Sequence, residues 1–315
     1  MPEKIFYSIF TIGVGLAFAP LLLGIINRTK AFFAGRKGQP LLQLYFDLWK
    51  LLHKGAVYSR TTTWIFRCGP VIGLAAMLIA LALMPFAGVP SPVGFTCDFV
   101  LLIFILGIAR FSTVISALDT GSSFEAMGAS REVQFSAFAE PALIISLITI
   151  CLQTKSLELS QMIGRIPVDS FSAITPAMSL TAFVIFVILL VENCRIPFDD
   201  PNTHLELTMI HEVMVLDHSG PDLAFILYSA ALKLWILGTL LIGVVVPVRG
   251  SGLLVNLVVS VSCMFGLGIL IGITESVMAR FRLIRIPQML VGAGALVILA
   301  LVLVLLGLWS DEKLD

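Results

Sequence analysis

Ionisable side chains occur inside long apolar stretches of this sequence and at the ends of such stretches. Three lie within them and three close them: Arg110, Glu140 and Lys233, and Asp119, Glu192 and Glu275. A charged group at the centre of a bilayer costs about 2.5–3.5 kcal/mol, so each must face protein or water rather than lipid. Two interpretations remain open, namely ion pairs that hold helices together and a hydrated path for protons. The mixture of several carboxylates with cations favours the proton path.

The segment with the most titratable groups is residues 196–221. It combines carboxylates with three histidines spaced seven residues apart: Asp199, Asp200, Glu206, Glu212 and Asp217, with His204, His211 and His218. On a continuous helix, seven residues advance about 10 Å, so these histidines would share a face but not a metal ion. Val215 stands where a zinc-protease motif starting at His211 needs its second histidine. Because histidine titrates near neutral pH, a proton relay and a polar loop packed on a partner both remain open.

Cysteine usage and motif content argue against a cofactor or catalytic site in this chain. The five cysteines are scattered, without a CxxC pair: Cys68, Cys97, Cys151, Cys194 and Cys263. Iron–sulfur and zinc sites need clustered thiolates, so we interpret these residues as buried small apolar side chains. No Walker motif, GxGxxG turn or nucleophile elbow occurs. The formal net charge of +0 provides no basic field for nucleic acid.

The elements that must position these side chains are transmembrane helices. Of the 315 residues, 58% are hydrophobic and 13% are charged, which is about half the charged share of a soluble domain. A helix needs about 20 apolar residues to cross the hydrocarbon core, and the alternating pattern of a membrane barrel is absent. The sequence therefore predicts an all-α polytopic membrane protein, one membrane domain over residues 1–315. Its eight predicted spans are 5–26, 68–89, 99–118, 135–154, 174–192, 223–248, 253–275 and 286–309.

The distribution of lysine and arginine predicts how these spans are oriented. Thirteen of these residues lie in loops on one side, eight of them between the first two spans, and five lie on the other side. Cytoplasmic loops carry the excess of positive charge. We therefore expect a multi-pass protein of the inner (plasma) membrane, with the large loops in the cytoplasm and both termini outside.

Two local patterns add to this picture. Within residues 39–54, an otherwise apolar segment carries one polar stripe, made of Gln43, Asp47, Lys50 and Lys54. An amphipathic helix of this kind lies in the membrane interface, and anchoring to lipid or docking of a partner both remain open. In a later span, Gly268 and Gly272 form a GxxxG pattern, which we interpret as a helix-packing contact.

Four segments together resemble one family of membrane subunits. They are residues 35–52 (GRKGQPLLQLYFDLWKLL), residues 109–143 with Glu140 before Pro141, the set Glu192, Arg195, Pro197, Phe198 and Asp199, and the pair Glu206-Leu207. The chain resembles the subunit of respiratory complex I that joins the peripheral arm to the antiporter-like subunits. Over essentially its whole length it is more similar to the counterpart in formate hydrogenlyase and in group 4 membrane-bound nickel–iron hydrogenases.

Two departures from complex I fall near the region where that complex admits quinone. Asn202 and His204 replace two glutamates of an acidic run that ends at Glu206, and residues 119–122 replace a W-x-S-N pattern. The hydrogenase branch of the family is therefore favoured. A quinone-reactive subunit of a complex I-like dehydrogenase remains the main alternative.

The resemblance implies a subunit that acts only within a larger complex. Iron–sulfur clusters and a nickel–iron site would lie in partners, which are hydrogenase-like large and small subunits and an iron–sulfur subunit, with antiporter-like subunits in the membrane. This chain would dock the peripheral arm and couple electron transfer to translocation of protons or sodium ions. Residues assigned to the proton path are Glu140, Glu192, Asp199, Glu206 and Lys233. Residues assigned to tuning or docking are Arg36, Asp47, Arg110, Asp119, Arg131, Arg195, His204, His211 and Glu212.

Two other classes of function rank behind this one. A stand-alone secondary transporter is expected to show inverted repeats around a midplane site, and the two halves of this sequence show no such repeat. A purely structural anchor has no need for ionisable groups this dense inside its spans.

Overall fold

The computed structural model describes residues 2–166, 176–199, 210–246 and 252–312, and every regular element in these ranges is a helix. This confirms the predicted all-α polytopic membrane fold. The helices are α1 (Pro2–Phe33), α2 (Gln43–Leu52), α3 (Trp64–Leu83), α4 (Asp98–Asp119), α5 (Ser123–Thr154), α6 (Leu159–Arg165), α7 (Pro176–Glu192), α8 (His211–Met214), α9 (Pro221–Val245), α10 (Leu253–Val277) and α11 (Arg285–Glu312).

Each predicted span corresponds to one helix of the structure. Within the described ranges, seven helices are long and apolar enough to cross a membrane: α1, α3, α4, α5, α9, α10 and α11. The eighth span corresponds to α7, a shorter apolar helix of 17 residues. The amphipathic helix predicted within residues 39–54 is α2. The short helices α6 and α8 carry no apolar periodicity long enough to predict them.

The start of α5 differs most from prediction, because the helix begins at Ser123 rather than at residue 135. Glu125 lies in its first turn, where the positive end of the helix dipole favours a carboxylate. The backbone N–H of Asp217 also donates to Glu125 at 3.2 Å. Hydropathy alone misses this first third of α5 because its polar residues lower the local average.

The boundaries of α3 are shifted toward the N-terminus of the chain, to Trp64 and Leu83 instead of residues 68 and 89. Thr63 caps the start of the helix, since its side chain accepts a hydrogen bond from the backbone N–H of residue 65. At the other end, Met84 is extended, as the residue before a proline usually is. Pro85 therefore ends the helix inside the predicted span.

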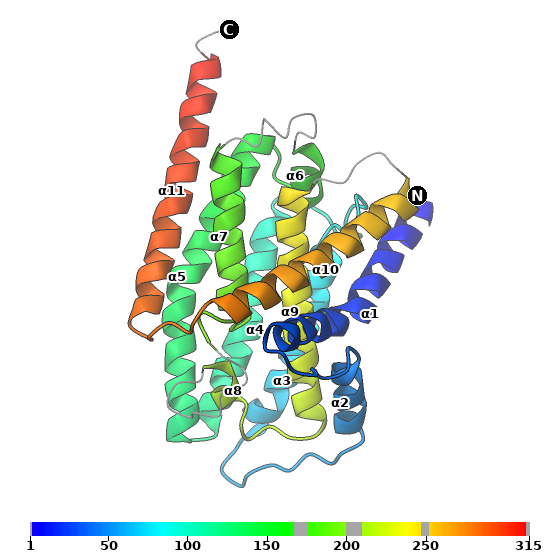
Figure 1. Cartoon of the computed structure of the whole chain (residues 1–315), viewed down its shortest axis with the longest axis vertical. Helices are drawn as coiled ribbons and strands as arrows, with labels where there is room; N and C mark the ends of the chain where they lie inside the picture. Colours follow the sequence, from blue (N-terminus) through cyan, green and yellow to red (C-terminus); the bar gives the residue numbers. More distant parts are fainter. Residues whose placement is uncertain (1, 167–175, 200–209, 247–251, 313–315) are drawn as a thin grey trace.

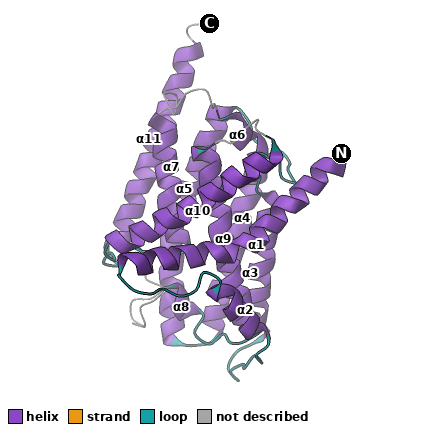
Figure 2. Cartoon of the chain, turned by 45° about the vertical axis from the view of Figure 1, so that its right-hand side comes forward, coloured by secondary structure: helices purple, strands orange, loops and turns teal. Residues whose placement is uncertain are grey.

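The helices form a bundle whose two ends carry different elements (Figures 1 and 2). The α2 end carries α2, α8 and the segment 53–63, and the α6 end carries α6 and the segment 84–97. α10 crosses the bundle obliquely and packs on α1, while α11 lies against α5 and α7. α9 is the most buried of the described spans, so most of its side chains face protein.

The contact between α1 and α10 depends on the two glycines of the GxxxG pattern. A Cβ atom on Gly272 would lie 2.7 Å from the Cβ of Thr29 and 3.1 Å from the carbonyl oxygen of Ile26. A Cβ atom on Gly268 would lie 2.8 Å from Cδ1 of Leu22. The predicted packing role of this motif is confirmed, because any larger residue here would separate the helices.

Candidate functional site

Five charged side chains from four helices meet inside the bundle and form what we call the central ion cluster: Arg110 on α4, Glu132 and Glu140 on α5, Glu192 on α7 and Lys233 on α9. The terminal guanidinium nitrogens of Arg110 donate hydrogen bonds to Glu140 and Glu192. Lys233 Nζ lies 2.8 Å from Glu192 Oε2, and Arg110 Nε lies 3.4 Å from Glu132 Oε1. One guanidinium group thus links α4 to α5 and α7, and Lys233 adds α9.

The helices explain why these groups must pair with one another. Arg110 lies in the middle of α4 and Lys233 in the middle of α9, where neither side chain can reach the end of its helix. Glu192 is the last residue of α7, at the negative end of the helix dipole, which disfavours a carboxylate. The two cations offset that cost. On α5, Glu132 and Glu140 are about two turns apart.

Burial differs sharply among the members of the cluster. The side chains of Arg110 and Glu192 are 7% and 5% exposed, and that of Lys233 is 17% exposed. The side chain of Glu140 is 40% exposed, although it lies near the middle of the long helix α5. The cluster therefore reaches from the interior of the bundle to its lateral surface at Glu140.

A cavity of about 90 Å³ adjoins the cluster. Its lining includes four members of the cluster, together with Cys194, Arg195 and His211. A smaller cavity of about 10 Å³ is lined by Glu132, Glu192, Cys194, Phe198 and Asp199. Since one water needs roughly 10–15 Å³ of such space, the smaller cavity fits about one water and the larger one several. Both linings mix apolar side chains with charged ones that can hydrogen-bond water.

A second set of ion pairs lies toward the α2 end. Glu275 on α10 lies 2.8 Å from Lys30 Nζ and accepts a hydrogen bond from Arg195 at 3.5 Å. Asp199 accepts hydrogen bonds from Arg280 at 2.8 Å and from the backbone N–H of Ile210 at 2.9 Å. These pairs hold the segment that follows α7 against α1 and α10. Arg195 lines the central cavity but pairs with Glu275 rather than with Glu192.

Two of the three histidines, His211 and His218, are described, and their positions favour the alternative to a histidine relay. α8 ends at Met214, so His211 and His218 do not share one continuous helix. His218 instead stacks on Phe66, with ring centroids 3.9 Å apart. Burial lowers the pKa of His218 to about 4, and burial together with the positive charge of Lys233 lowers the pKa of His211 to about 4. Both rings are therefore neutral near pH 7, where a histidine relay would have to titrate.

The remaining predicted residues are dispersed. Asp119 accepts hydrogen bonds from the backbone N–H and the hydroxyl of Thr63, at 2.7 and 2.8 Å, and so fastens the start of α3 to the end of α4. Asp47 accepts a hydrogen bond from Gln43 at 2.9 Å along α2. Arg36 lines an open groove of about 580 Å³ at the α2 end. Of four others, Arg131 and Glu212 are half-buried, whereas His204 and Glu206 lie outside the described residues.

Sequence reasoning missed several charged residues that take part in these contacts. The sequence does not single out Glu132, because residues 123–134 contain many polar side chains and precede the apolar segment 135–154 that predicts the span. Lys30 and Arg280 enter the sequence analysis only as basic residues of the loops that predict orientation. Asp98 is fully buried and accepts a hydrogen bond from the backbone N–H of Leu159 at 2.7 Å, which ties α4 to α6. The one available signal for Glu132 was its place eight residues before Glu140, which puts both side chains near one face of a helix.

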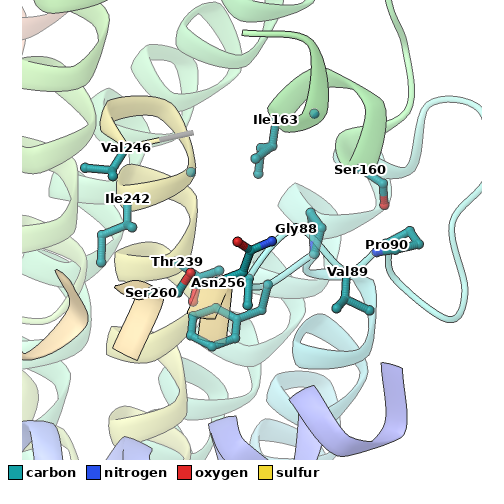
Figure 3. A pocket seen from close by; sticks show the side chains of 15 residues that line it. Gly88, Val89, Pro90, Ser160, Ile163, Thr239, Ile242, Val246, Asn256 and Ser260 are labelled. Atoms are coloured by element: carbon teal, nitrogen blue, oxygen red, sulfur yellow. The ribbon is translucent and has the colours of Figure 1, made fainter. Parts of the chain in front are cut away.

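A further cavity, of about 300 Å³, lies at the α6 end between α6, α9, α10 and the segment 85–90 (Figure 3). Thr239 Oγ1 and Asn256 Oδ1 are buried there without a hydrogen-bond partner among the described residues. None of the described residues that line this cavity is ionisable. Within the described ranges, no three His, Cys, Asp or Glu side chains are arranged to hold a metal ion. Among the described residues, the buried ion pairs lie in the central ion cluster and in the second set around Glu275 and Asp199.

Comparisons with known proteins agree with this architecture. Residues 5–308 match a family model described as NADH dehydrogenase. The chain is 30% identical over 294 residues to formate hydrogenlyase subunit 4 of Escherichia coli (strain K12), covering 90% of this chain and 94% of that protein. It is 30% identical over 301 residues to hydrogenase-4 component C of the same strain, covering 93% of each.

One solved structure has the same fold along nearly the whole chain. It is a chain of the membrane-bound sulfane sulfur reductase, an archaeal respiratory membrane complex, with a TM-score of 0.82 at 16% identity. The alignment covers 96% of this chain and 99% of that one. With a family model spanning residues 5–308 and two relatives matched over most of their length, the chain belongs to the NADH dehydrogenase family of membrane proteins.

Proposed function

We propose that this chain is the membrane-anchoring and ion-path subunit of an energy-converting complex of the hydrogenase or formate hydrogenlyase type. In that role it docks a peripheral arm, whose partners hold iron–sulfur clusters and a nickel–iron site, and couples electron transfer to translocation of protons or sodium ions. The names of its relatives, formate hydrogenlyase subunit 4 and hydrogenase-4 component C, support the type of complex. The central ion cluster supports the ion path.

The observation that carries the proposal is the exposure of Glu140. This carboxylate is hydrogen-bonded to Arg110, yet 40% of its side chain is open at the lateral surface of a helix that crosses the membrane. An ionisable group at that depth is too costly to face lipid. A polar surface of a neighbouring membrane subunit therefore covers it in the complex. The cluster then passes charge sideways, toward an antiporter-like partner.

The path we propose begins at the α2 end and has two stages. Asp199, held by Arg280, lines the small cavity beside Glu192. Glu192 shares Arg110 with Glu140, so a change in the protonation of one carboxylate alters the field at the other. An electrostatic change at the docked arm would in this way reach Glu140. Glu206, assigned to the same path, lies outside the described residues.

Docking of the peripheral arm is assigned to the α2 end. Arg36 and Lys37 are exposed along the open groove there, and α2 exposes Phe46 and Trp49 by 61% and 69%. Aromatic and arginine side chains are enriched at protein interfaces.

Ion translocation fits the described cavity better than quinone chemistry does. The cavity at the central ion cluster measures about 90 Å³, whereas pockets for small organic ligands usually measure about 300–1,000 Å³. Water and protons fit the smaller space. The quinone-reactive alternative would require a larger tunnel reaching this cluster.

The proposal is tested by Glu140→Gln in the assembled complex. Gln keeps the size of the side chain and cannot exchange a proton, so we expect ion translocation in membrane vesicles to fall to background. Electron transfer by the complex and its subunit composition should stay as in the wild type, measured by activity assay and mass spectrometry. Glu158→Gln, at the start of α6 and outside the cluster, serves as the control. Undiminished translocation in the Glu140 variant would refute the proposed path.

A further inference from the structure

The charges in the central ion cluster do not balance. Three carboxylates face only two cations, Arg110 and Lys233, so the cluster carries one net negative charge when every group is ionised. An uncompensated charge shielded from water is strongly disfavoured. One carboxylate is therefore expected to hold a proton, and the contacts within the cluster indicate which one.

The cations pair closely with two of the carboxylates, Glu140 and Glu192, but not with the third, Glu132. Arg110 donates to Glu140 and Glu192, and Lys233 pairs with Glu192. Glu132 has only Arg110 Nε, at 3.4 Å, and that nitrogen has no hydrogen-bond partner among the described residues. The side chain of Glu132 is 12% exposed, against 40% for Glu140. Glu132 is thus the buried carboxylate whose negative charge is least compensated.

The other cations near Glu132 are Lys233 and Arg195, and each pairs with a different carboxylate, Lys233 with Glu192 and Arg195 with Glu275. The ionisable groups around Glu132 are Arg110 on α4, Glu140 on its own helix, Glu192 on α7, Lys233 on α9, Cys194, Arg195 and Asp199 in the segment after α7, and His211 on α8. Cys194 donates weakly to Glu132 Oε2 at 3.9 Å. Burial raises the pKa of the Cys194 thiol, and the charges of Glu132 and Asp199 raise it further. Cys194 therefore stays a neutral thiol.

Glu132 also lies between the two cavities beside the cluster. It lines both the cavity of about 90 Å³ and the cavity of about 10 Å³. Asp199 lines only the smaller cavity, whereas Arg110 and Lys233 line only the larger one. A proton that enters beside Asp199 therefore meets Glu132 or Glu192 first, and Glu192 is occupied by two cations.

We propose that Glu132 carries the exchangeable proton of the central ion cluster and passes it between Asp199 and the pair Glu192–Glu140. This inference rests on the proposed function. In the loading step, a hydrated proton in the smaller cavity gives its proton to a carboxylate oxygen of Glu132. A new O–H bond forms there, one O–H bond of the donor breaks, and the cluster becomes neutral. In the release step, the proton leaves to a water in the larger cavity.

Infrared spectroscopy of the purified full-length chain in lipid nanodiscs tests the location of the proton. A protonated buried carboxylic acid gives a carbonyl-stretch band, which shifts in heavy water and disappears when the pH is raised. We expect this titrating band in the wild type near neutral pH and its loss in Glu132→Gln. The band should keep its frequency in Glu140→Asp, which changes a carboxylate on the same helix but leaves the charge of the cluster unchanged. Glu132→Asp should keep a titrating band at an altered frequency, which covers the case in which the Gln variant does not fold.

The outcomes separate this inference from the proposed function. A band that survives in the Glu132→Gln variant, or whose frequency shifts in Glu140→Asp, overturns the assignment to Glu132. A band that moves with sodium concentration at constant pH does the same, since it indicates a bound cation. In the assembled complex, we expect Glu132→Gln to abolish translocation while electron transfer continues. If the wild-type complex translocates no ion, the proposed function fails, but the infrared result still decides where the proton resides.

Discussion

At the scale of single residues, the burial of His218 makes the folded state less stable as the pH falls. It is 5% exposed and stacks on Phe66, and burial lowers its pKa to about 4. In an unfolded chain the pKa of histidine is about 6.5. Above pH 6.5 the ring is neutral in both states and has no effect. Between pH 6.5 and 4 only the unfolded chain takes up the proton, so the free energy of unfolding falls as the pH falls.

We predict that His218→Phe weakens this acid sensitivity, because a Phe ring can stack on Phe66 and cannot bind a proton. Between pH 7.5 and 5, the loss in free energy of unfolding should be smaller than in the wild type by about 2 kcal/mol. Denaturant titrations of the detergent-solubilised chain at both pH values measure this difference. His53→Gln, at an exposed histidine, should leave the loss unchanged. An equal loss in the wild type and the Phe variant would contradict the prediction.

The same scale shows which parts of the candidate site the sequence can predict. Arg110, Glu192 and Lys233 were identified by their cost inside apolar helices, a property that each residue carries on its own. Which carboxylate pairs with which cation depends on contacts between helices far apart in sequence, and periodicity contains no information on that. Glu132 escapes the sequence analysis for a related reason. It lies in the polar first third of α5, which hydropathy does not identify as part of a transmembrane helix.

At the scale of elements, the contact between α1 and α10 offers a matched pair of substitutions. A methyl group on Gly272 would meet Thr29 and the backbone of Ile26, whereas a methyl group on Gly266 meets nothing within 4 Å. Gly272→Ala should therefore lower the free energy of unfolding by about 1–3 kcal/mol. Gly266→Ala should be neutral or slightly stabilising, because Ala favours helix more than Gly does. Thermal unfolding of both variants checks this, and similar melting temperatures would argue against close packing.

Element boundaries show where apolar patterns stop being informative. Helix interiors were predicted because about 20 apolar residues leave only one way to cross a bilayer. The ends depend instead on single local interactions. Thr63 sets the start of α3, Pro85 sets its end, and Glu125 allows α5 to begin at Ser123. Such interactions leave hydropathy almost unchanged, so several helix boundaries differ from the predicted ones, although the helices follow the predicted order.

At the scale of the whole molecule, the uneven distribution of basic residues predicts one orientation in the membrane. Eight lysines and arginines lie between the first two spans alone, and they belong to the end of the bundle that carries α2 and α8. α6 and the C-terminal end of α5 lie at the opposite end (Figure 1). The proposed docking of a peripheral arm needs the α2 end to face the cytoplasm, so orientation and function depend on one another.

Labelling of single introduced cysteines in intact cells tests this orientation. Lys37, exposed near the end of α1, and Lys155, exposed at the end of α5, lie at opposite ends of the bundle. We predict that a membrane-impermeant maleimide labels Lys155→Cys in intact cells and labels Lys37→Cys only after the membrane is opened. The wild-type chain, with its five native cysteines, gives the background. The reverse pattern would turn the α2 end outward, away from any cytoplasmic arm, and would remove the basis for the proposed docking while leaving the ion cluster as described.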